Sequence, residues 1–433
     1  MAAAKPITTM KDHTLRRRIV LAVTTDRSLR LLKGQPAYLS DLGWDVHLIS
    51  NGDSGRDPQV ELGPSPSVTF HRIPMERDPS IVADFVSMWR WFRLLRSLKP
   101  DVVCVGTPKA AMLGIWSSWL AMVPTRIYLI RGLRYETIKS PLVRQIFIAV
   151  ERVTGRLATH VISVSASMGR VALEAGIGRR TGIDVIGAGS SNGVTILPDE
   201  DVARLKADRE ALLREMGLAH ELATIGWVGR LTPDKGTTQL VRACQLLVQR
   251  EVPFQLLMLG REDFEGSGHL EELRIMLQSA GVRYAHHDHV TDPERLMAQL
   301  DVLCLPSFRE GLPNVPLEAA ALGIPVVTSD ATGCVDAVVH GQTGLIVPRS
   351  DVEALADALE ALVTDSEMCR EFGAAGRAWV MENFERRAVW RLYADYYAQA
   401  AEQALTICAT GPKQRDETIR SLELPSTKGK DTS

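Results

Sequence analysis

Residues 301–322 read DVLCLPSFREGLPNVPLEAAAL, which is an apolar strand-like stretch, a polar loop and a strongly helical run in succession. Pro316 suits the first turn of the helix, where its missing N–H removes no hydrogen bond. Glu310 then falls in the loop and Glu318 in the first turn of the helix. Ligands of open parallel sheets bind outside the carboxyl ends of the strands, so both acids are predicted to face that space.

The loop between the two acids suits a ligand that carries both hydroxyls and phosphate. Ionised carboxylates only accept hydrogen bonds, which fits a sugar or a ribose. Backbone amides at a helix N-terminus point donors at an anion, and here they belong to Gly311, Leu312, Asn314 and Val315. Alternatively, Glu318 merely interacts with the helix dipole, worth about 0.3–1 kcal/mol, and Glu310 is a solvated loop residue.

A second segment adds two cations at the same edge of the predicted sheet. In WVGRLTPDKG, residues 227–236, a strand ends at Gly229 and Arg230, and Lys235 follows a turn five residues later. Fixed cations stabilise the charge that develops on a departing diphosphate. The alternative interpretation of Arg230 and Lys235 is a solvated charged turn.

The chain alternates short apolar strands with helix-length stretches, which is typical of parallel α/β architecture. We expect two doubly wound, Rossmann-like domains that face each other across a cleft. The expected strands are 18–24, 45–50, 101–106, 126–132 and 160–165 in the first, and 224–230, 254–260, 301–307, 324–329 and 343–348 in the second. The expected divisions are a tail at 1–17, domains at 18–195 and 196–383, a terminal helix at 384–409 and a disordered tail at 410–433.

Composition favours a globular protein with no general attraction for polyanions. The 433 residues are 45% hydrophobic, and 50 Lys and Arg balance 52 Asp and Glu. We therefore expect no nucleic-acid partner. The six Cys are scattered singly without metal-ligand spacing, which suggests a reduced, cytoplasmic setting and no metal site. The longest weakly polar run, 110–124, is shorter than the ~20 residues of a spanning helix.

Three motifs in the second half resemble the retaining glycosyltransferases of family 4, which have the GT-B fold. They are GR-x4-KG at 229–236, PS-x2-EG-x6-E at 306–318 and A-x2-G-x-PVV at 320–327. The similarity continues through 332–359 and the terminal helix, which in this fold crosses back to the first domain. GSSNGV at 189–194 is similar to the branch that builds capsule, exopolysaccharide and related surface glycans.

The resemblance implies a role for each matching residue. Arg230 and Lys235 match the positions that hold the donor diphosphate, and Glu318 matches the one that binds ribose hydroxyls. Glu310 matches the position that contacts the donor sugar, and the amides after Gly311 match the loop that cradles sugar and phosphate. The implied reaction transfers a hexosyl or N-acetylhexosaminyl group with retention, from a UDP-linked donor to a saccharide or lipid-linked saccharide. It needs no metal and no cofactor.

The first half departs from many relatives at two positions. Where they carry Gly-Gly in the first loop, this chain has only Gly34, a candidate for close approach to the donor. Where they carry His-Gly after the fourth strand, it has Arg131. Arginine cannot act as a base, so Arg131 would steady charge near the reacting centre. The alternative is a structural pair with Glu136, and Asn192 is expected near the hinge or the cleft.

Residues 85–99 form a predicted helix with an aromatic stripe and several arginines. Phe85, Trp89 and Phe92 share one side, with Arg90 and Arg93 nearby. A basic helix with aromatics can lie on an anionic membrane surface. The other interpretation is a core face with a solvated basic side. The location is accordingly cytoplasmic, with peripheral contact at the inner face of the cell membrane in the first interpretation.

Three other functions compete with sugar transfer. A GT-B epimerase or phosphorylase shares the fold, but the Glu310 and Glu318 pair with Arg230 and Lys235 argues against it. A sugar-nucleotide-binding subunit without activity would explain the departures at Gly34 and Arg131. A dehydrogenase is disfavoured because no G-x-G-x-x-G follows a strand.

Overall fold

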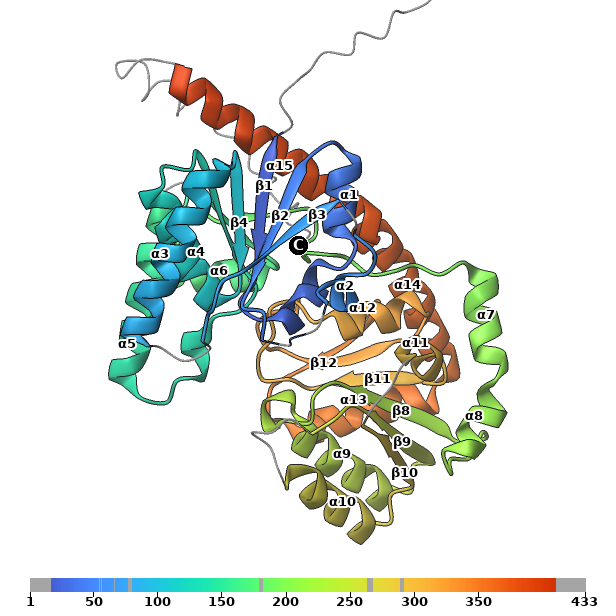
Figure 1. Cartoon of the computed structure of the whole chain (residues 1–433). Coiled ribbons are helices and arrows are strands. Elements are labelled where there is room, and N and C mark those ends of the chain that lie inside the picture. Colours follow the sequence, from blue (N-terminus) through green and yellow to red (C-terminus); the bar gives the residue numbers. More distant parts are fainter. Residues whose placement is uncertain are drawn as a thin grey trace, which may run out of the picture.

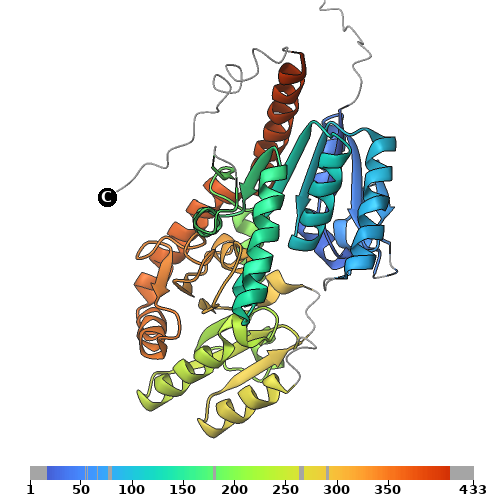
Figure 2. The ribbon, with the colours of Figure 1, turned by 90° about the vertical axis from the view of Figure 1, so that its left-hand side faces the viewer.

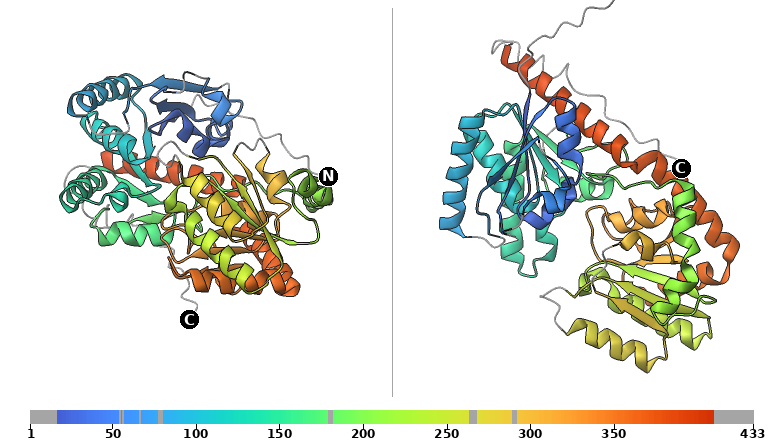
Figure 3. Two further views of the ribbon diagram at one scale, coloured as in Figure 1. Left: turned by 90° about the horizontal axis from the view of Figure 1, so that it is seen from below. Right: turned by 45° about the vertical axis from the view of Figure 1, so that its right-hand side comes forward.

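The computed structural model describes residues 17–409 except 54, 56, 66, 77–79, 179–181, 263–267 and 289–291. These residues form two α/β lobes joined by a long final helix that runs along the first lobe (Figures 1 and 3). The tail predicted at 410–433 lies outside the described residues.

The first lobe is built on a seven-stranded parallel sheet in the order β3-β2-β1-β4-β5-β6-β7. Its central strands are apolar and buried on both faces, as expected for parallel strands covered by helices. The sequence patterns did not predict the two edge strands, β3 and β7. Strand β3 carries exposed polar residues, and β7 has only two residues. The strands are β1 (Arg18–Ala22), β2 (Asp45–Ser50), β3 (Val68–Arg72), β4 (Val102–Gly106), β5 (Thr125–Ile130), β6 (His160–Ser163) and β7 (Asp184–Val185).

The second lobe repeats this order in a six-stranded parallel sheet, β10-β9-β8-β11-β12-β13. The edge strand β10 was also missed, because its sequence YAHH lacks an apolar run. The strands are β8 (Ala223–Val228), β9 (Phe254–Leu259), β10 (Tyr284–His287), β11 (Val302–Leu305), β12 (Val326–Ser329) and β13 (Gly344–Val347).

Helices cover both faces of each sheet (Figure 1). In the first lobe they are η1 (Asp26–Leu32), α1 (Gln35–Asp41), α2 (Gln59–Leu62), α3 (Ile81–Leu98), α4 (Pro108–Leu120), η2 (Arg134–Thr137), α5 (Pro141–Leu157) and α6 (Ala166–Glu174). Those that follow are α7 (Asp199–Ala207), α8 (Arg209–Glu215), η3 (Pro233–Lys235), α9 (Thr237–Gln249), α10 (His269–Ser279), α11 (Pro293–Met297), α12 (Asn314–Ala321), α13 (Val352–Thr364), α14 (Ser366–Phe384) and α15 (Arg386–Ala409).

The chain crosses between the lobes twice, and the two crossings pair with each other. The Val194 amide donates to the Phe384 carbonyl at 2.9 Å, and the Arg386 amide donates to the Val194 carbonyl at 3.0 Å. Gly193 precedes this pair in a left-handed conformation, and a Cβ there would lie 2.7 Å from the Phe384 oxygen. A side chain would therefore separate the crossings, which explains the glycine. The domain boundaries expected beside these crossings stay predictions.

Helix α15 closes one face of the first sheet, so the predicted returning helix is confirmed together with the α/β class. Tyr393 and Tyr397 on this helix are completely buried in the core beneath the sheet. The Trp390 indole donates to Asn192 Oδ1 at 2.6 Å, and Asn192 Nδ2 donates to the Lys33 carbonyl at 3.1 Å. A Cβ on Gly34 would lie 2.4 Å from the Trp390 ring. Gly34 thus has a packing reason for its missing side chain.

Replacing Tyr397 with Ala should lower the free energy of unfolding by about 3–5 kcal/mol, because a large buried ring leaves a cavity in the first lobe. Gln399→Ala is the matched control, since Gln399 is exposed on the same helix, and it should change stability by less than about 0.5 kcal/mol. Urea unfolding measures both. Equal effects of the two substitutions would show that α15 does not stabilise the first lobe.

Candidate functional site

An ion pair joins two of the predicted residues at the carboxyl edge of the second sheet. Lys235 Nζ lies 2.5 Å from Glu310 Oε1, and the two side chains are only 15% and 14% exposed. The Ser307 hydroxyl donates to the same carboxylate oxygen at 3.0 Å. The other oxygen of Glu310 makes no hydrogen bond with another described residue, so it can accept one from a ligand.

The backbone brings these two side chains together. Lys235 ends the turn after β8, and Glu310 lies in the loop after the neighbouring strand β11. Gly236 is left-handed, and a Cβ on it would lie 1.9 Å from the Pro306 carbonyl oxygen. The Phe308 amide donates to the Asp234 carbonyl at 2.9 Å. The two loops are thus in direct backbone contact, which only glycine permits at position 236.

Further charges surround the turn. Burial alone would raise the pKa of Asp234, but the Thr232 hydroxyl and the charges of Lys235, Arg309 and Arg230 hold that pKa below its ordinary value. Arg309 Nη2 lies 3.5 Å from the Asp234 carboxylate. Arg230 is exposed. The structure therefore groups Arg230 and Lys235 at one edge, and it adds Arg309, which the sequence patterns did not single out.

The loop after Glu310 is confined on both sides. A Cβ on Gly333 would lie 2.5 Å from the Gly311 oxygen, and one on Gly311 would lie 2.3 Å from the Arg131 oxygen of the first lobe. At the ends of the paired strands β8 and β9, a Cβ on Gly260 would lie 1.6 Å from the Gly229 oxygen. Gly229 and Gly311 therefore sit at backbone-to-backbone contacts that fix the shape of this edge.

The loop amides lead directly into α12. Pro313 precedes the helix, so Asn314 and Val315 are its first two residues. Their N–H groups have no carbonyl one turn earlier in the helix to accept a hydrogen bond. Leu312 packs against both the core under α15 and the core beside α14. Leu312 thus anchors the loop where the lobes meet, and the helix N-terminus offers donors to an anion.

Glu318 lies in a different place from Glu310. It lines a small pocket at the crossings with Glu294 and Arg386, and neither Glu310 nor Lys235 is among the residues of that pocket. Burial raises the pKa of Glu318, Glu294 adds to this effect, and Arg386 opposes it. The other lining residues are Thr195, Leu197, Ala321 and Leu322. The two carboxylates therefore lie in separate places, and nothing in the sequence singled out Glu294 or Arg386.

The Arg131 guanidinium is directed into the protein. It donates to the Ser191 hydroxyl and, at 3.5 Å, to the Leu31 carbonyl. Burial lowers the pKa of Arg131, and Tyr393, Cys104 and Tyr397 oppose that shift. Glu136, its suggested partner, instead has a pKa raised by burial and opposed by Arg309, Arg144 and Arg349. Arg131 therefore joins η1 to the segment that precedes the crossing at Val194.

Hydrogen bonds also link the lobes at the N-terminus of α6. The Ser165 hydroxyl donates to the Gly311 carbonyl at 2.7 Å. The Ser167 hydroxyl hydrogen-bonds to Asp336 and accepts from the Gly333 amide at 2.7 Å. We call these five residues, Ser165, Ser167, Gly311, Gly333 and Asp336, the latch. No sequence pattern pointed to the latch, because its hydrogen-bonded partners are 146 to 169 residues apart along the chain.

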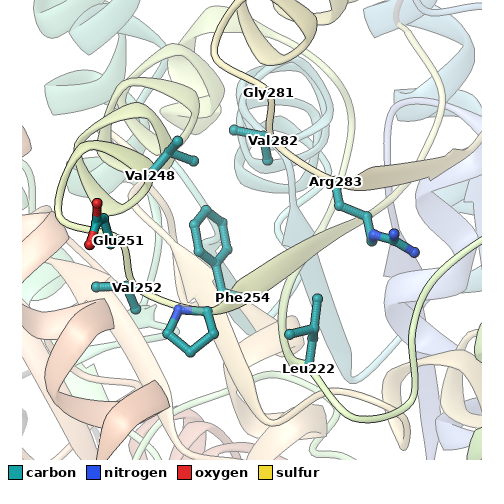
Figure 4. Close-up of a pocket in the computed structure, with 9 residues that line it drawn as sticks. Leu222, Val248, Glu251, Val252, Phe254, Gly281, Val282 and Arg283 are labelled. Atoms are coloured by element: carbon teal, nitrogen blue, oxygen red, sulfur yellow. The ribbon is translucent and has the colours of Figure 1, made fainter.

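Other candidate features lie elsewhere or are absent from the described residues. A surface pocket lined by Phe254, Val282 and Arg283 lies at the amino end of the second sheet (Figure 4), away from the ion pair. The ranges that the structure describes contain no cluster of His, Cys, Asp or Glu that could hold a metal ion. None of the described helices is both long and apolar enough to cross a bilayer.

The family models and a curated relative that match this chain are all glycosyltransferases. Residues 33–189 match the model of a glycosyl transferase 4-like domain, and residues 208–379 match that of glycosyl transferases group 1. The chain is 31% identical over 369 residues to the capsular polysaccharide biosynthesis glycosyltransferase CapM of Staphylococcus aureus, covering 85% of this chain and 93% of CapM.

Two solved structures share the fold of the whole molecule. Sucrose-phosphate synthase of Thermosynechococcus elongatus matches with a TM-score of 0.71 at 20% identity, over 89% of this chain and 99% of that one. HepE of Anabaena in complex with UDP matches with a TM-score of 0.71 at 20% identity, over 88% and 99%. The predicted GT-B fold is thereby confirmed.

Gly236→Ala should destabilise the protein more than Gly217→Ala. Both glycines are left-handed, with φ of 69° and 74°, but only Gly236 has an atom close to the added Cβ. Left-handed strain should cost about 1–2 kcal/mol in each variant, and overlap with Pro306 should cost about 1–3 kcal/mol more in Gly236→Ala. Urea unfolding gives the difference. Equal losses would mean that the loops can separate freely.

Proposed function

Because the chain belongs to the family 4 glycosyltransferases, we propose that it transfers a sugar, with retention, from a UDP-linked donor to a saccharide or lipid-linked saccharide. The transferred group is a hexosyl or N-acetylhexosaminyl unit, and the product is part of a capsule or related surface glycan. Similarity to CapM over most of the chain supports the pathway class. The UDP complex of HepE supports the choice of nucleotide.

The partly buried Lys235–Glu310 pair beside the α12 N-terminus is the observation on which the proposal depends. A cation, a carboxylate with one uncommitted oxygen and a row of backbone donors lie together where the loops after β8 and β11 meet. In the proposal, Lys235 and Arg230 hold the diphosphate together with the amides of α12. The free oxygen of Glu310 accepts a hydrogen bond from a hydroxyl of the donor sugar.

The proposed reaction is a displacement on one face of the sugar. The bond from the anomeric carbon to the diphosphate oxygen breaks, and a bond to the acceptor oxygen forms on the same face. The proton of the acceptor hydroxyl passes to the departing phosphate oxygen, so no protein base is required. Lys235 and Arg230 stabilise the negative charge that accumulates on that phosphate.

The remaining predicted residues act around this centre. Glu318 receives the ribose hydroxyls of the donor in the pocket at the crossings, where Arg386 helps to keep the carboxylate ionised. Arg131 acts as a positioning residue rather than a catalytic one, because its contacts are Ser191 and Leu31. We place the protein in the cytoplasm, in peripheral contact with the inner face of the cell membrane through residues 85–99.

Two substitutions at the ion pair should separate binding from turnover. With the best donor from a panel of nucleotide sugars, Glu310→Gln should reduce the release of UDP at least about 100-fold, while leaving the Kd of UDP unchanged. Lys235→Gln should weaken UDP binding about 10–100-fold, since it removes a charged hydrogen bond. Calorimetry gives the Kd, and a coupled assay gives the turnover.

Glu271→Gln is the control for these variants, because Glu271 is 68% exposed on α10. It should leave both quantities unchanged. If the protein binds UDP but no nucleotide sugar is turned over, it is the non-catalytic subunit. A product whose anomeric configuration is inverted, observed by NMR, would contradict the retaining mechanism.

As the pH is lowered, UDP binding should begin to weaken at a higher pH than it would if Glu318 had the pKa of an ordinary glutamate. The pKa of Glu318 is raised above 4.5, so this carboxylate gains its proton, and loses hydrogen-bond acceptors, at a higher pH. The phosphates of UDP titrate as well, so the informative quantity is the ratio of affinities between the native protein and Glu318→Gln. That ratio should fall toward one as the pH falls through the raised pKa. A ratio independent of pH would exclude Glu318 from the ribose site.

A further inference from the structure

The outer side of the first lobe exposes an unusual amount of apolar surface. Along α3, Phe85 is 67% exposed and Trp89 is 52% exposed; along α5, Leu142 is 73% and Ile146 is 55% exposed. A core face would bury these side chains, so the core interpretation of the aromatic stripe is wrong for Phe85 and Trp89. The exposed members are Ile81, Val82, Phe85, Val86, Trp89, Leu142, Val143, Ile146 and Val153. We call them the α3–α5 face.

The two helices belong to one layer. Helix α4 packs between α3 and α5, and all three cover the outer side of the first sheet (Figures 1 and 2). Both α3 and α5 begin at the carboxyl ends of parallel strands, the same end at which Arg131 and Ser165 contact the second lobe. Most of the exposed apolar side chains lie in the first two turns of α3 and of α5. The α3–α5 face therefore borders the region where the proposed reaction takes place.

Every exposed charge on these two helices is positive. On α3, the exposed charged residues are Arg90, Arg93 and Arg96, and on α5 they are Arg144 and Arg156. The acidic side chain of each helix is paired with another residue inside the protein. Asp84 pairs with Lys109 at 2.5 Å, and the buried Glu151 hydrogen-bonds to Tyr128. This asymmetry contrasts with the balanced charge of the whole chain.

Arginine and tryptophan are arranged here as they are at lipid interfaces. The Arg93 guanidinium lies 4.8 Å from the centre of the Trp89 ring, which holds a cation beside an exposed aromatic. Amphipathic aromatics insert at the level of the headgroups, while long basic side chains extend to the phosphates. A protein partner would need acids opposite these arginines, whereas an anionic bilayer supplies negative charge over its entire surface.

We propose that the α3–α5 face docks on an anionic lipid bilayer, with apolar side chains of both helices inserted among the headgroups and their arginines on the lipid phosphates. The docking extends the contact proposed for residues 85–99 to a second helix, and it rests on the proposed function only for the identity of the acceptor. It places the meeting point of the lobes next to the membrane. A lipid-linked acceptor could then reach the site without leaving the bilayer.

The test is sedimentation of the full chain with sucrose-loaded vesicles, of phosphatidylcholine alone or of equimolar phosphatidylcholine and phosphatidylglycerol. The protein should bind the anionic vesicles, bind the neutral ones far less, and dissociate at high salt. Phe85→Ser with Trp89→Ser should lower partitioning at least about tenfold, and Leu142→Ser with Ile146→Ser should do the same. Each Arg→Gln change at Arg90, Arg93 or Arg144 should lower it about fivefold.

Matched controls lie on the second lobe. Ile275 on α10 is 56% exposed, the counterpart of Ile146, and Arg370 on α14 is also exposed. Ile275→Ser and Arg370→Gln should bind vesicles as the native protein does. Thermal unfolding of every variant confirms that the fold is retained. Loss of binding in the α3 variant alone would overturn the participation of α5.

Other outcomes would overturn the docking altogether. These are equal binding to neutral and anionic vesicles, or no binding to either. A dimer in solution that Ile146→Ser dissociates, without vesicle binding, would show that the face joins two copies of the chain. The assay contains no nucleotide sugar, so its failure leaves the transferase proposal intact. UDP release in the absence of vesicles tests that proposal separately.

Discussion

The candidate site depends on the close contact between two neighbouring loops of the second sheet. Gly236 lies so close to the Pro306 carbonyl that any side chain would force the loops apart. This contact fixes the turn that ends at Lys235, and it sets Lys235 against Glu310. Holding a mobile turn in one conformation would cost about 1–2 kcal/mol per residue in backbone entropy, in addition to the side-chain entropy of the lysine. Fixing its backbone makes the ion pair a rigid part of the site.

Two kinds of contact hold the lobes together, and they differ in what it takes to separate them. Helix α15 buries Tyr393 and Tyr397 under the first sheet, and exposing such rings would cost several kcal/mol. The latch consists of hydrogen bonds from Ser165 and Ser167, with a net value of about 0.5–1.5 kcal/mol for the bond between neutral groups and about 1.5–3 kcal/mol for the bond to the Asp336 carboxylate. The paired crossings at Val194 and Phe384 lie on the side of α15. The lobes can therefore part most easily at the latch.

The positions of the charged residues, rather than the net charge of the chain, decide which surfaces attract anions. The formal net charge is −2, which by itself disfavours association with an anionic surface. Folding changes this outcome locally, because Asp84 and Glu151 turn inward while the arginines of α3 and α5 stay outside. In the second lobe, likewise, Arg230, Lys235 and Arg309 gather around Asp234. Both surfaces acquire a positive character that the composition conceals.

The sequence by itself determined the α/β class, the central strands and the charged residues of the loops that follow β8 and β11. Buried parallel strands are apolar throughout, and the spacing of Gly, Pro and charged residues after β8 and β11 is local information. It could not reveal the edge strands β3 and β10, whose residues are partly exposed and therefore mixed.

Only the tertiary structure decided which distant groups meet. It separated Glu318 from Glu310 and placed it with Glu294 and Arg386. It directed Arg131 inward, and it joined Ser167 to Asp336 across the lobes. Contacts between residues far apart in the chain depend on how whole sheets and helices pack, and no local pattern encodes that geometry.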